Sequence, residues 1–241
     1  MQKPQFVKEY IYHIYNRGVE KRKTFLDDAD RLRFIHDLFE MNDEAPAGNV
    51  LYYFDPQSME VQPQYIPQER KPRKLLVEIL AFVLMPNHFH LLLRQKKEKG
   101  IIRFMQKFGT AYTMYFNKKY TRVGGLFQGR YKAVIVQEQA HFTYIPFYIH
   151  ANPVELMIGK SIYGGSTSID WKKVMRFLEE YRWSSFPDYI GRKNFPSLTS
   201  RDFLSDYFGG AQAIRKDMQK LLQDRENTSK DLNDMRTVLF D

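Results

Sequence analysis

The sequence contains no cysteine among its 241 residues. Disulfides, thiolate zinc sites and a cysteine nucleophile are therefore excluded. It also lacks a long apolar run, since the longest stretch, from Ile79 to Pro86, is far short of the roughly 20 residues that span a bilayer. The polar start of the chain has no signal-peptide pattern. We therefore expect a soluble intracellular protein without a membrane partner, cytoplasmic and associated with the nucleoid when it binds DNA.

The sequence has fewer acidic residues than basic ones. The chain has 28 Asp plus Glu against 37 Lys plus Arg, which gives a formal net charge of +9 at pH 7. Such an excess favours an anionic partner, nucleic acid first and an acidic membrane surface second. Aromatic residues make up 15% of the chain, and rings beside basic residues suit stacking on single-stranded bases as well as an ordinary core.

Hydrophobic periodicity predicts a regular order of elements. Strands are expected over Val7 to Tyr15, Val77 to Leu84, His88 to Leu93 and Tyr131 to Gln137, and helices over Asp28 to Met41 and Ile101 to Lys119. The resulting order matches the ferredoxin-like β-α-β-β-α-β pattern. We therefore predict an α+β fold with an antiparallel sheet, followed by an added helix over Phe142 to Asn152.

Two regions fall outside this core. Residues 42–74 carry five prolines in a polar stretch and are interpreted as an insertion that contains a hairpin. Beyond residue 157 we expect a helical C-terminal extension, 158–241, with a helix around Trp171 to Tyr181, two polar helices after Arg201 and a charged tail over Asp224 to Asp234. Residues 1–157 are then the first domain.

Two histidines stand at alternate positions of one predicted strand. His88 and His90 flank Phe89, and the side chains of a strand alternate between its faces, so both imidazoles point to the same side. Such a pair can hold a divalent ion and leave coordination positions open. The alternative is two ordinary histidines on a partly exposed strand.

A tyrosine and an asparagine share one face of the added helix. Tyr148 and Asn152 are one turn apart. A phenol can attack a phosphodiester and form a phosphotyrosine, and an Asn oxygen can complete the shell of a metal. The alternative is a packed tyrosine and an asparagine that ends the helix before Pro153. Pro146 either kinks this helix or lies in its first turn, with a start near Ile145.

Basic residues cluster beside two predicted strand ends, one after the first strand and one before the last. Both clusters can grip phosphates while Phe127 or Tyr131 stacks on a base. The alternative is a pair of solvated charged turns. The candidate DNA-binding residues are Asn16, Arg17, Lys21, Arg22, Lys23, Gln128, Arg130 and Lys132.

Five short motifs, taken in this order, resemble those of one family. They are Ile14-Tyr15-Asn16-Arg17-Gly18, Phe25-Leu26-Asp27-Asp28, Met85-Pro86-Asn87-His88-Phe89-His90, Leu126-Phe127-Gln128-Gly129-Arg130 and Tyr148-Ile149-His150-Ala151-Asn152-Pro153. The chain resembles a single-tyrosine His-hydrophobe-His (HUH) transposase of the insertion-sequence type, most of all the branch associated with repetitive extragenic palindromes. The resemblance covers roughly Val7 to Met157, and Trp183-Ser184-Ser185 resembles a C-terminal landmark of that branch.

The resemblance implies a role for each site residue. His88 and His90 would be metal ligands, Tyr148 the nucleophile and Asn152 a third ligand. Members of the family cut single-stranded DNA near hairpins with Mg²⁺ or Mn²⁺, retain a 5′-phosphotyrosine and release a 3′-hydroxyl. Some act as homodimers that exchange the tyrosine helix. The expected function is thus a metal-dependent DNA strand transferase of DNA transposition or related processing, with single-stranded or hairpin DNA as partner.

The residues leave two other functions open. One is a non-catalytic nucleic-acid-binding protein derived from a transposase, against which the intact histidines and Tyr148 count. The other is a zinc hydrolase, against which the lack of a carboxylate beside the two histidines counts. Other tyrosines compete with Tyr148, and His13 and His150 either assist the site or simply pack. The competing tyrosines are Tyr112, Tyr115, Tyr120 and Tyr144.

Overall fold

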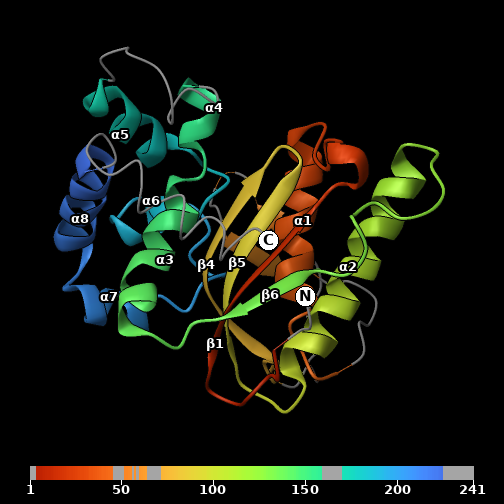
Figure 1. The fold of residues 1–241 in the computed structure, drawn as a ribbon. Coiled ribbons are helices and arrows are strands. Elements are labelled where there is room, and N and C mark those ends of the chain that lie inside the picture. Colours follow the sequence, from red (N-terminus) through yellow and green to blue (C-terminus); the bar gives the residue numbers. More distant parts are fainter. Residues whose placement is uncertain are drawn as a thin grey trace.

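The protein was analysed as a computed structural model, which describes residues 4–45, 52–55, 57, 60–63, 72–158 and 170–224. Its core elements are β1 (Ile11–Arg17), α1 (Asp28–Glu40), β4 (Val77–Met85), β5 (His88–Gln95), α2 (Gly100–Lys119) and β6 (Lys132–Ile135). The four strands form one antiparallel sheet in the order β4-β5-β1-β6 (Figure 1). This order is the ferredoxin-like topology, so the predicted α+β fold is confirmed.

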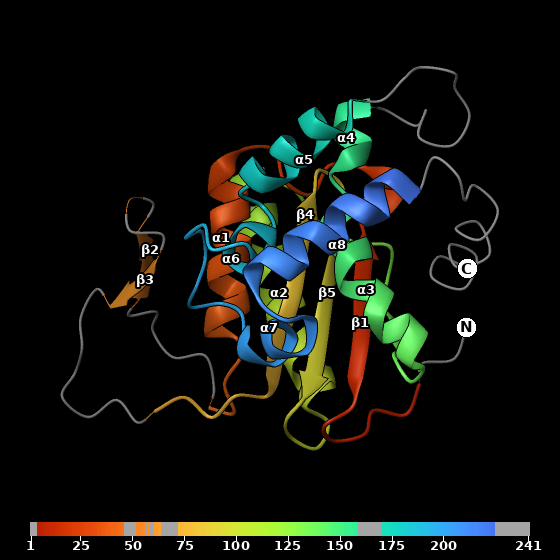
Figure 2. The same cartoon turned by 90° about the vertical axis from the view of Figure 1, so that its left-hand side faces the viewer.

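The insertion contains the expected hairpin. Strands β2 (Tyr52–Asp55) and β3 (Glu60–Pro63) pair antiparallel in a separate two-stranded sheet, which lies beside α1 in Figure 2. The rest of the predicted insertion between residues 46 and 71, apart from residue 57, lies outside the described residues. The hairpin therefore adds to one side of the core without entering the four-stranded sheet.

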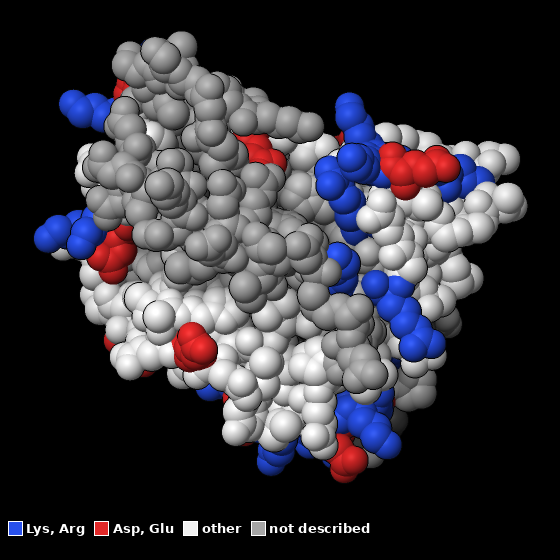
Figure 3. All heavy atoms as spheres, in the orientation of Figure 1, with Lys and Arg blue, Asp and Glu red and all other residues white. Residues whose placement is uncertain are grey.

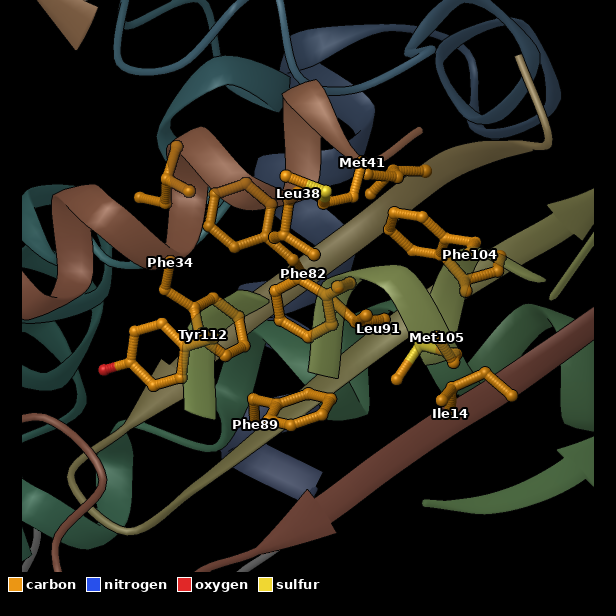
Figure 4. Packing of buried hydrophobic residues seen from close by; sticks show 14 of the residues in the cluster. Ile14, Phe34, Leu38, Met41, Phe82, Phe89, Leu91, Phe104, Met105 and Tyr112 are labelled. Atoms are coloured by element: carbon orange, nitrogen blue, oxygen red, sulfur yellow. The ribbon is translucent and has the colours of Figure 1, made fainter. Parts of the chain in front are cut away.

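Helices α1 and α2 cover one face of the sheet. Because side chains alternate along a strand, Ile14 of β1 and Phe89 of β5 point to this side, where they meet rings from both helices (Figure 4). The ring of Phe34 in α1 lies 4.6 Å from that of Phe108 in α2 and 5.1 Å from that of Phe89, centroid to centroid. Each such ring stabilises the fold by roughly 1.5–3 kcal/mol through burial.

Local sequence signals set the start of α1. Asp27 accepts a hydrogen bond from the backbone N–H of Asp30 at 2.9 Å, and the Asp30 carboxylate accepts one from the backbone N–H of Asp27. This reciprocal capping satisfies N–H groups that a helix start leaves unpaired. Lys119, at the end of α2, donates to both carboxylates. The cap of α1 thereby also fixes the position of α2.

The opposite face of the sheet carries the remaining helices (Figure 2). A second core joins Leu80 of β4 and Leu92 of β5 to Ile149 of α3 and Met218 of α8. The C-terminal extension therefore shares a core with the sheet. These helices are α3 (Gln139–Ala151), α4 (Val154–Ile158), α5 (Trp171–Glu180), α6 (Phe186–Tyr189), α7 (Asp202–Phe208) and α8 (Ala211–Asp224). None of the described helices is both long and apolar enough to cross a membrane.

The segment that begins at Trp183 covers the edge strand β4. The carbonyl of Trp183 accepts from the N–H of Leu84 at 2.8 Å, and the N–H of Ser185 donates to the carbonyl of Phe82 at 3.0 Å. An uncovered edge strand offers unpaired backbone groups to other chains. The Trp183-Ser184-Ser185 motif thus closes one edge of the sheet. The predicted tail over Asp224 to Asp234 lies outside the described residues, except for Asp224.

Three sequence-based boundaries are wrong. β1 starts at Ile11, later than the predicted Val7, and continues beyond the predicted end at Tyr15 to Arg17, since Asn16 and Arg17 pair with β5. β6 covers only Lys132–Ile135. α3 begins at Gln139 and holds Pro146 in its interior, so a start near Ile145 is excluded. An interior proline removes one helical hydrogen bond, and packing of the buried helix against the sheet outweighs that loss.

Candidate functional site

Three imidazoles share the sheet face that lies toward α3. In the β1–β5 register Tyr15 is opposite His90 and Arg17 is opposite His88, so His13, Tyr15 and Arg17 project to the same side as both histidines of β5. The ring centroids of His88 and His90 are 5.1 Å apart with their planes at 85°. Alternation along β5 therefore places the two candidate ligands side by side, and strand pairing adds His13, Tyr15 and Arg17 to them.

α3 brings Tyr148 to this group. The Tyr148 ring lies 5.9 Å from the His90 ring at an interplanar angle of 90°, and 6.1 Å from the His13 ring at 80°. Tyr144, one turn earlier in α3, lies 6.0 Å from Tyr148. In contrast, Tyr112 lies on the α1–α2 side, where its hydroxyl donates to the carbonyl of Thr24 at 2.6 Å. Tyr115 and Tyr120 also lie there, bonded to Asp30.

Asn152 caps the C-terminal end of α3 and turns toward His88. Its Nδ2 donates to the backbone carbonyl of Tyr148 at 2.9 Å, which leaves the amide oxygen to face other groups. The Asn152 side chain lies close enough to His88 to raise the pKa of its ring, against the larger lowering by burial. The structure therefore brings together all four residues assigned to the predicted catalytic and metal site: His88, His90, Tyr148 and Asn152.

Burial keeps the imidazoles neutral. Removal from water lowers the pKa of His13 to about 3 and holds that of His90 well below its usual value. Burial, with a smaller effect from the positive charge of Arg17, lowers the pKa of His88 to about 4, and the neighbouring Asn152 side chain opposes this shift. At pH 7 all three rings thus carry a lone pair, the form in which histidine ligates metal.

The donor set of this site consists of two nitrogens and an amide oxygen. No group of three His, Cys, Asp or Glu side chains suited to a metal occurs among the described residues. A metal ion on His88 and His90 would need a further ligand, and the Asn152 side chain, which has an amide oxygen, lies beside His88. Neutral nitrogen and oxygen donors with remaining open positions suit a divalent ion that must also bind a substrate.

The two histidines left undecided by the sequence have different surroundings. His13 Nε2 lies 2.8 Å from His90 Nδ1, so His13 contacts a candidate ligand directly. His150 Nε2 lies 2.8 Å from the Ser185 hydroxyl, and its ring packs on Phe186. His150 therefore joins α3 to the C-terminal extension, whereas His13 belongs to the site.

The two basic segments meet at the end of the sheet next to His88. Gln128 N–H donates to the Arg17 carbonyl at 2.8 Å, and Val19 N–H donates to the Leu126 carbonyl at 3.0 Å. Figure 3 shows Lys and Arg side chains along the side of the molecule that carries β6 and α2. The exposed candidates of the two segments are Arg17, Lys21, Lys23, Gln128, Arg130 and Lys132.

Two of the predicted DNA-binding residues are less accessible. Arg22 is partly buried, and its guanidinium lies 3.4 Å from the Glu20 carboxylate. Asn16 is only 9% exposed, because it projects to the α1–α2 side, and its Nδ2 donates to the Gly129 carbonyl at 3.2 Å. Asn16 therefore links the two basic segments to each other.

Sequence reasoning missed two neighbours of the imidazoles. The Tyr15 ring stacks on that of His90 at 5.7 Å, which strand alternation with His13 was sufficient to indicate. Asn87, in the turn between β4 and β5, places its Oδ1 2.7 Å from His88 Nδ1. The position of Asn87 directly before His88 in the sequence could have indicated this contact. The orientation of the Asn87 side chain, however, depends on its hydrogen bond to the carbonyl of Lys21, 66 residues away.

Residues 57–152 match the family model of the IS200-like transposases. The matched segment starts in the insertion and ends at Asn152, so it contains both histidines of β5 and Tyr148. This match confirms the resemblance to a single-tyrosine transposase that the motifs indicated.

Two solved structures are similar to the chain. One is the REP-associated tyrosine transposase bound to a REP hairpin, at 15% identity and a TM-score of 0.49, over 84% of this chain and 92% of that one. The other is a candidate transposase from Deinococcus radiodurans R1, at 17% identity and a TM-score of 0.35, over 61% of this chain and 95% of that one. None of the curated proteins compared with the sequence matches it.

Proposed function

We propose that the protein is a metal-dependent DNA strand transferase that cleaves single-stranded DNA at hairpin-associated sites through a 5′-phosphotyrosine on Tyr148. It would serve DNA transposition or related DNA processing, in line with the match to IS200-like transposases. The observation that carries the proposal is the placement of the Tyr148 ring 5.9 Å from the His90 ring, centroid to centroid, with Asn152 of the same helix beside His88.

Tyr148 supplies the nucleophile. Its phenol oxygen forms a bond to phosphorus while the bond from phosphorus to the 3′-oxygen breaks, and the phenolic proton ends on the released 3′-hydroxyl. The 5′ side of the cut stays on the tyrosine. Attack by another 3′-hydroxyl on this ester reverses the step and joins strands without an external energy source.

The cofactor that we propose is Mg²⁺ or Mn²⁺, held by His88, His90 and Asn152. Such an ion would polarise a non-bridging phosphate oxygen and stabilise charge on the leaving oxygen. The residues fit it, because both imidazoles are neutral at pH 7 and project to one face. Tyr15 and His13 pack against His90 and restrict the movement of its ring.

Single-stranded or hairpin DNA is the proposed partner, gripped by the adjoining basic segments. Two exposed cations lie near the histidines in the sheet: Arg17 pairs with His88, and Lys132 pairs with Tyr15, which pairs with His90 on its other side. Phosphates bound there would lie close to the imidazoles and Tyr148. Tyr148 reaches the histidines of its own chain, so this arrangement needs no second copy, and the homodimer stays a prediction of the resemblance.

A covalent-trapping experiment tests the proposal. The protein is incubated with end-labelled single-stranded hairpin DNA and Mn²⁺ and then denatured. We expect a protein–DNA adduct that Tyr148→Phe abolishes and the matched control Tyr144→Phe retains, because Tyr144 lies one turn farther from Asn152. His88→Ala should abolish cleavage while hairpin affinity falls much less.

Three outcomes would contradict the proposal. Hairpin binding without an adduct under any divalent metal indicates a non-catalytic nucleic-acid-binding protein. Cleavage that survives Tyr148→Phe indicates water as the nucleophile and hence a hydrolase. Equal loss of cleavage and of hairpin affinity in His88→Ala indicates that the histidines are structural.

A further inference from the structure

Asn87 connects the basic segment to His88 through two hydrogen bonds. Its Nδ2 donates to the backbone carbonyl of Lys21 at 3.1 Å. Its Oδ1 lies 2.7 Å from Nδ1 of His88. One side-chain amide therefore bridges the turn after β1 and the first residue of β5, and nothing in the proposed function so far uses it.

These two bonds determine where His88 carries its proton. The Lys21 carbonyl can only accept, so it orients the amide of Asn87 with Nδ2 outward and Oδ1 toward the ring. An amide oxygen also only accepts, so the 2.7 Å contact requires a proton on His88 Nδ1. In the neutral imidazole the lone pair is then on Nε2.

The acceptor for Asn87 is itself held in place by a constrained turn. Glu20 and Lys21 have φ angles of +54° and +60°, a left-handed conformation that side-chain-bearing residues adopt only when their surroundings impose it. The surroundings are two further bonds to the turn between β4 and β5: Gly18 N–H to the Asn87 carbonyl at 2.8 Å and Thr24 N–H to the Pro86 carbonyl at 2.9 Å. The Lys21 carbonyl is thus locked in the direction of Asn87.

We propose that Asn87 is a positioning residue, which holds His88 as the Nδ1–H tautomer so that the ring ligates a metal through Nε2, and which ties this ligand to the DNA-gripping segment through Lys21. The inference rests on the proposed function for the identity of the metal ligand. Ligating histidines commonly donate their second ring nitrogen to an oxygen acceptor, which fixes the tautomer and raises the basicity of the ligand.

The contact of His90 does not fix a proton in the same way. His90 Nδ1 faces His13 Nε2 at 2.8 Å, and either imidazole can donate in that pair. Asn87 is therefore the residue that breaks the symmetry between the two possible tautomers at the candidate metal site.

The first test reads the tautomer without metal or DNA. Long-range ¹H–¹⁵N NMR of the full chain, ¹⁵N-labelled at histidine and recorded at pH 7, should show His88 with its proton on Nδ1. Asn87→Leu should remove this preference, whereas Asn87→Asp should keep it because a carboxylate also accepts. A wild-type His88 with its proton on Nε2, or an unchanged tautomer in Asn87→Leu, would overturn the proposal.

The second test measures Mn²⁺ affinity of the metal-free full chain by calorimetry. Asn87→Leu should weaken binding by about 10- to 100-fold, the range for loss of a partner that orients a ligand. The matched control is Asn117→Leu, because the Asn117 amide also donates to a loop carbonyl, that of Gly124 at 2.8 Å, but bonds to none of the imidazoles. Equal affinities in Asn87→Leu and the wild type would overturn the proposal.

The two tests separate this inference from the proposed function. If the wild type binds no Mn²⁺, the metal-dependent function fails, and the NMR experiment alone decides whether Asn87 sets the tautomer. If the wild type binds Mn²⁺ and forms the DNA adduct but Asn87→Leu behaves like it in both tests, the proposed function stands and the role of Asn87 is refuted.

Discussion

The dependence of DNA affinity on salt is the most direct test of the basic surface. Five exposed cations lie on the two adjoining segments: Arg17, Lys21, Lys23, Arg130 and Lys132. Each phosphate contact on a single strand contributes about −0.7 to the slope of log affinity against log salt, because bound counterions are released. With all five engaged the slope is about −3.5, and a rise from about 50 to about 200 mM salt lowers affinity on the order of 100-fold.

Two double variants with the same loss of charge separate local contacts from net charge. Arg17→Gln with Arg130→Gln should reduce the slope to about −2.1, since three contacts remain. The control pair, Lys216→Gln with Lys220→Gln, removes two exposed charges from α8, on the far side of the molecule from β6 in Figure 1. Fluorescence anisotropy with a labelled single strand measures both slopes. A flat salt response in the wild type, or equal changes in the two variants, would refute the assignment of the surface.

Two further predictions concern stability. Burial lowers the pKa of His150 to about 3, below the usual value of about 6.5 in the unfolded chain. Below about pH 6.5 the unfolded state therefore binds a proton at His150 that the folded state does not bind. The free energy of unfolding then falls as the pH drops. We expect His150 alone to lower the free energy of unfolding by about 2 kcal/mol between pH 7 and pH 5. Urea unfolding of His150→Gln at the two pH values should therefore show a loss of stability that is smaller by this amount. A loss identical to that of the wild type would contradict the argument. In Gly18→Ala the new Cβ would lie 2.3 Å from the Arg22 carbonyl oxygen, so we expect overpacking to destabilise the protein by about 1–3 kcal/mol and to weaken DNA binding. In the control Gly109→Ala the new Cβ meets nothing within 4 Å, so we expect the higher helix propensity of alanine to stabilise the protein by about 0.5–1 kcal/mol. Equal effects of the two substitutions on stability would count against the steric reasoning.

Local patterns were sufficient for the framework of the protein. The apolar spacing of the sequence predicted a helix over Asp28 to Met41, and the structure has Asp28–Glu40. Strand alternation placed His88 and His90 on the same side, and the order of elements predicted the ferredoxin-like core. These properties depend on neighbours within a few residues, so they can be read without knowledge of distant contacts.

Boundaries failed where distant partners decide them. Asn16 and Arg17 carry turn-like residue types but remain in β1, because β5 supplies their pairing partners. Pro146 is unfavourable inside a helix, yet α3 continues through it while both neighbouring turns pack on the sheet. In both cases tertiary contacts override the local conformational preference of the residue.

The arrangement of the site was partly determined by the sequence and completed by tertiary packing. Spacing alone put Tyr148 one turn from Asn152, but it did not show on which face of the sheet α3 would lie. Nor did it distinguish His13, which bonds to His90, from His150, which bonds to Ser185. The union of the two basic segments and the link from Lys21 through Asn87 to His88 join residues far apart in the chain. Such contacts arise only when packing of both sheet faces brings separate elements together, because periodicity encodes which face of an element is apolar but not which partner will cover it.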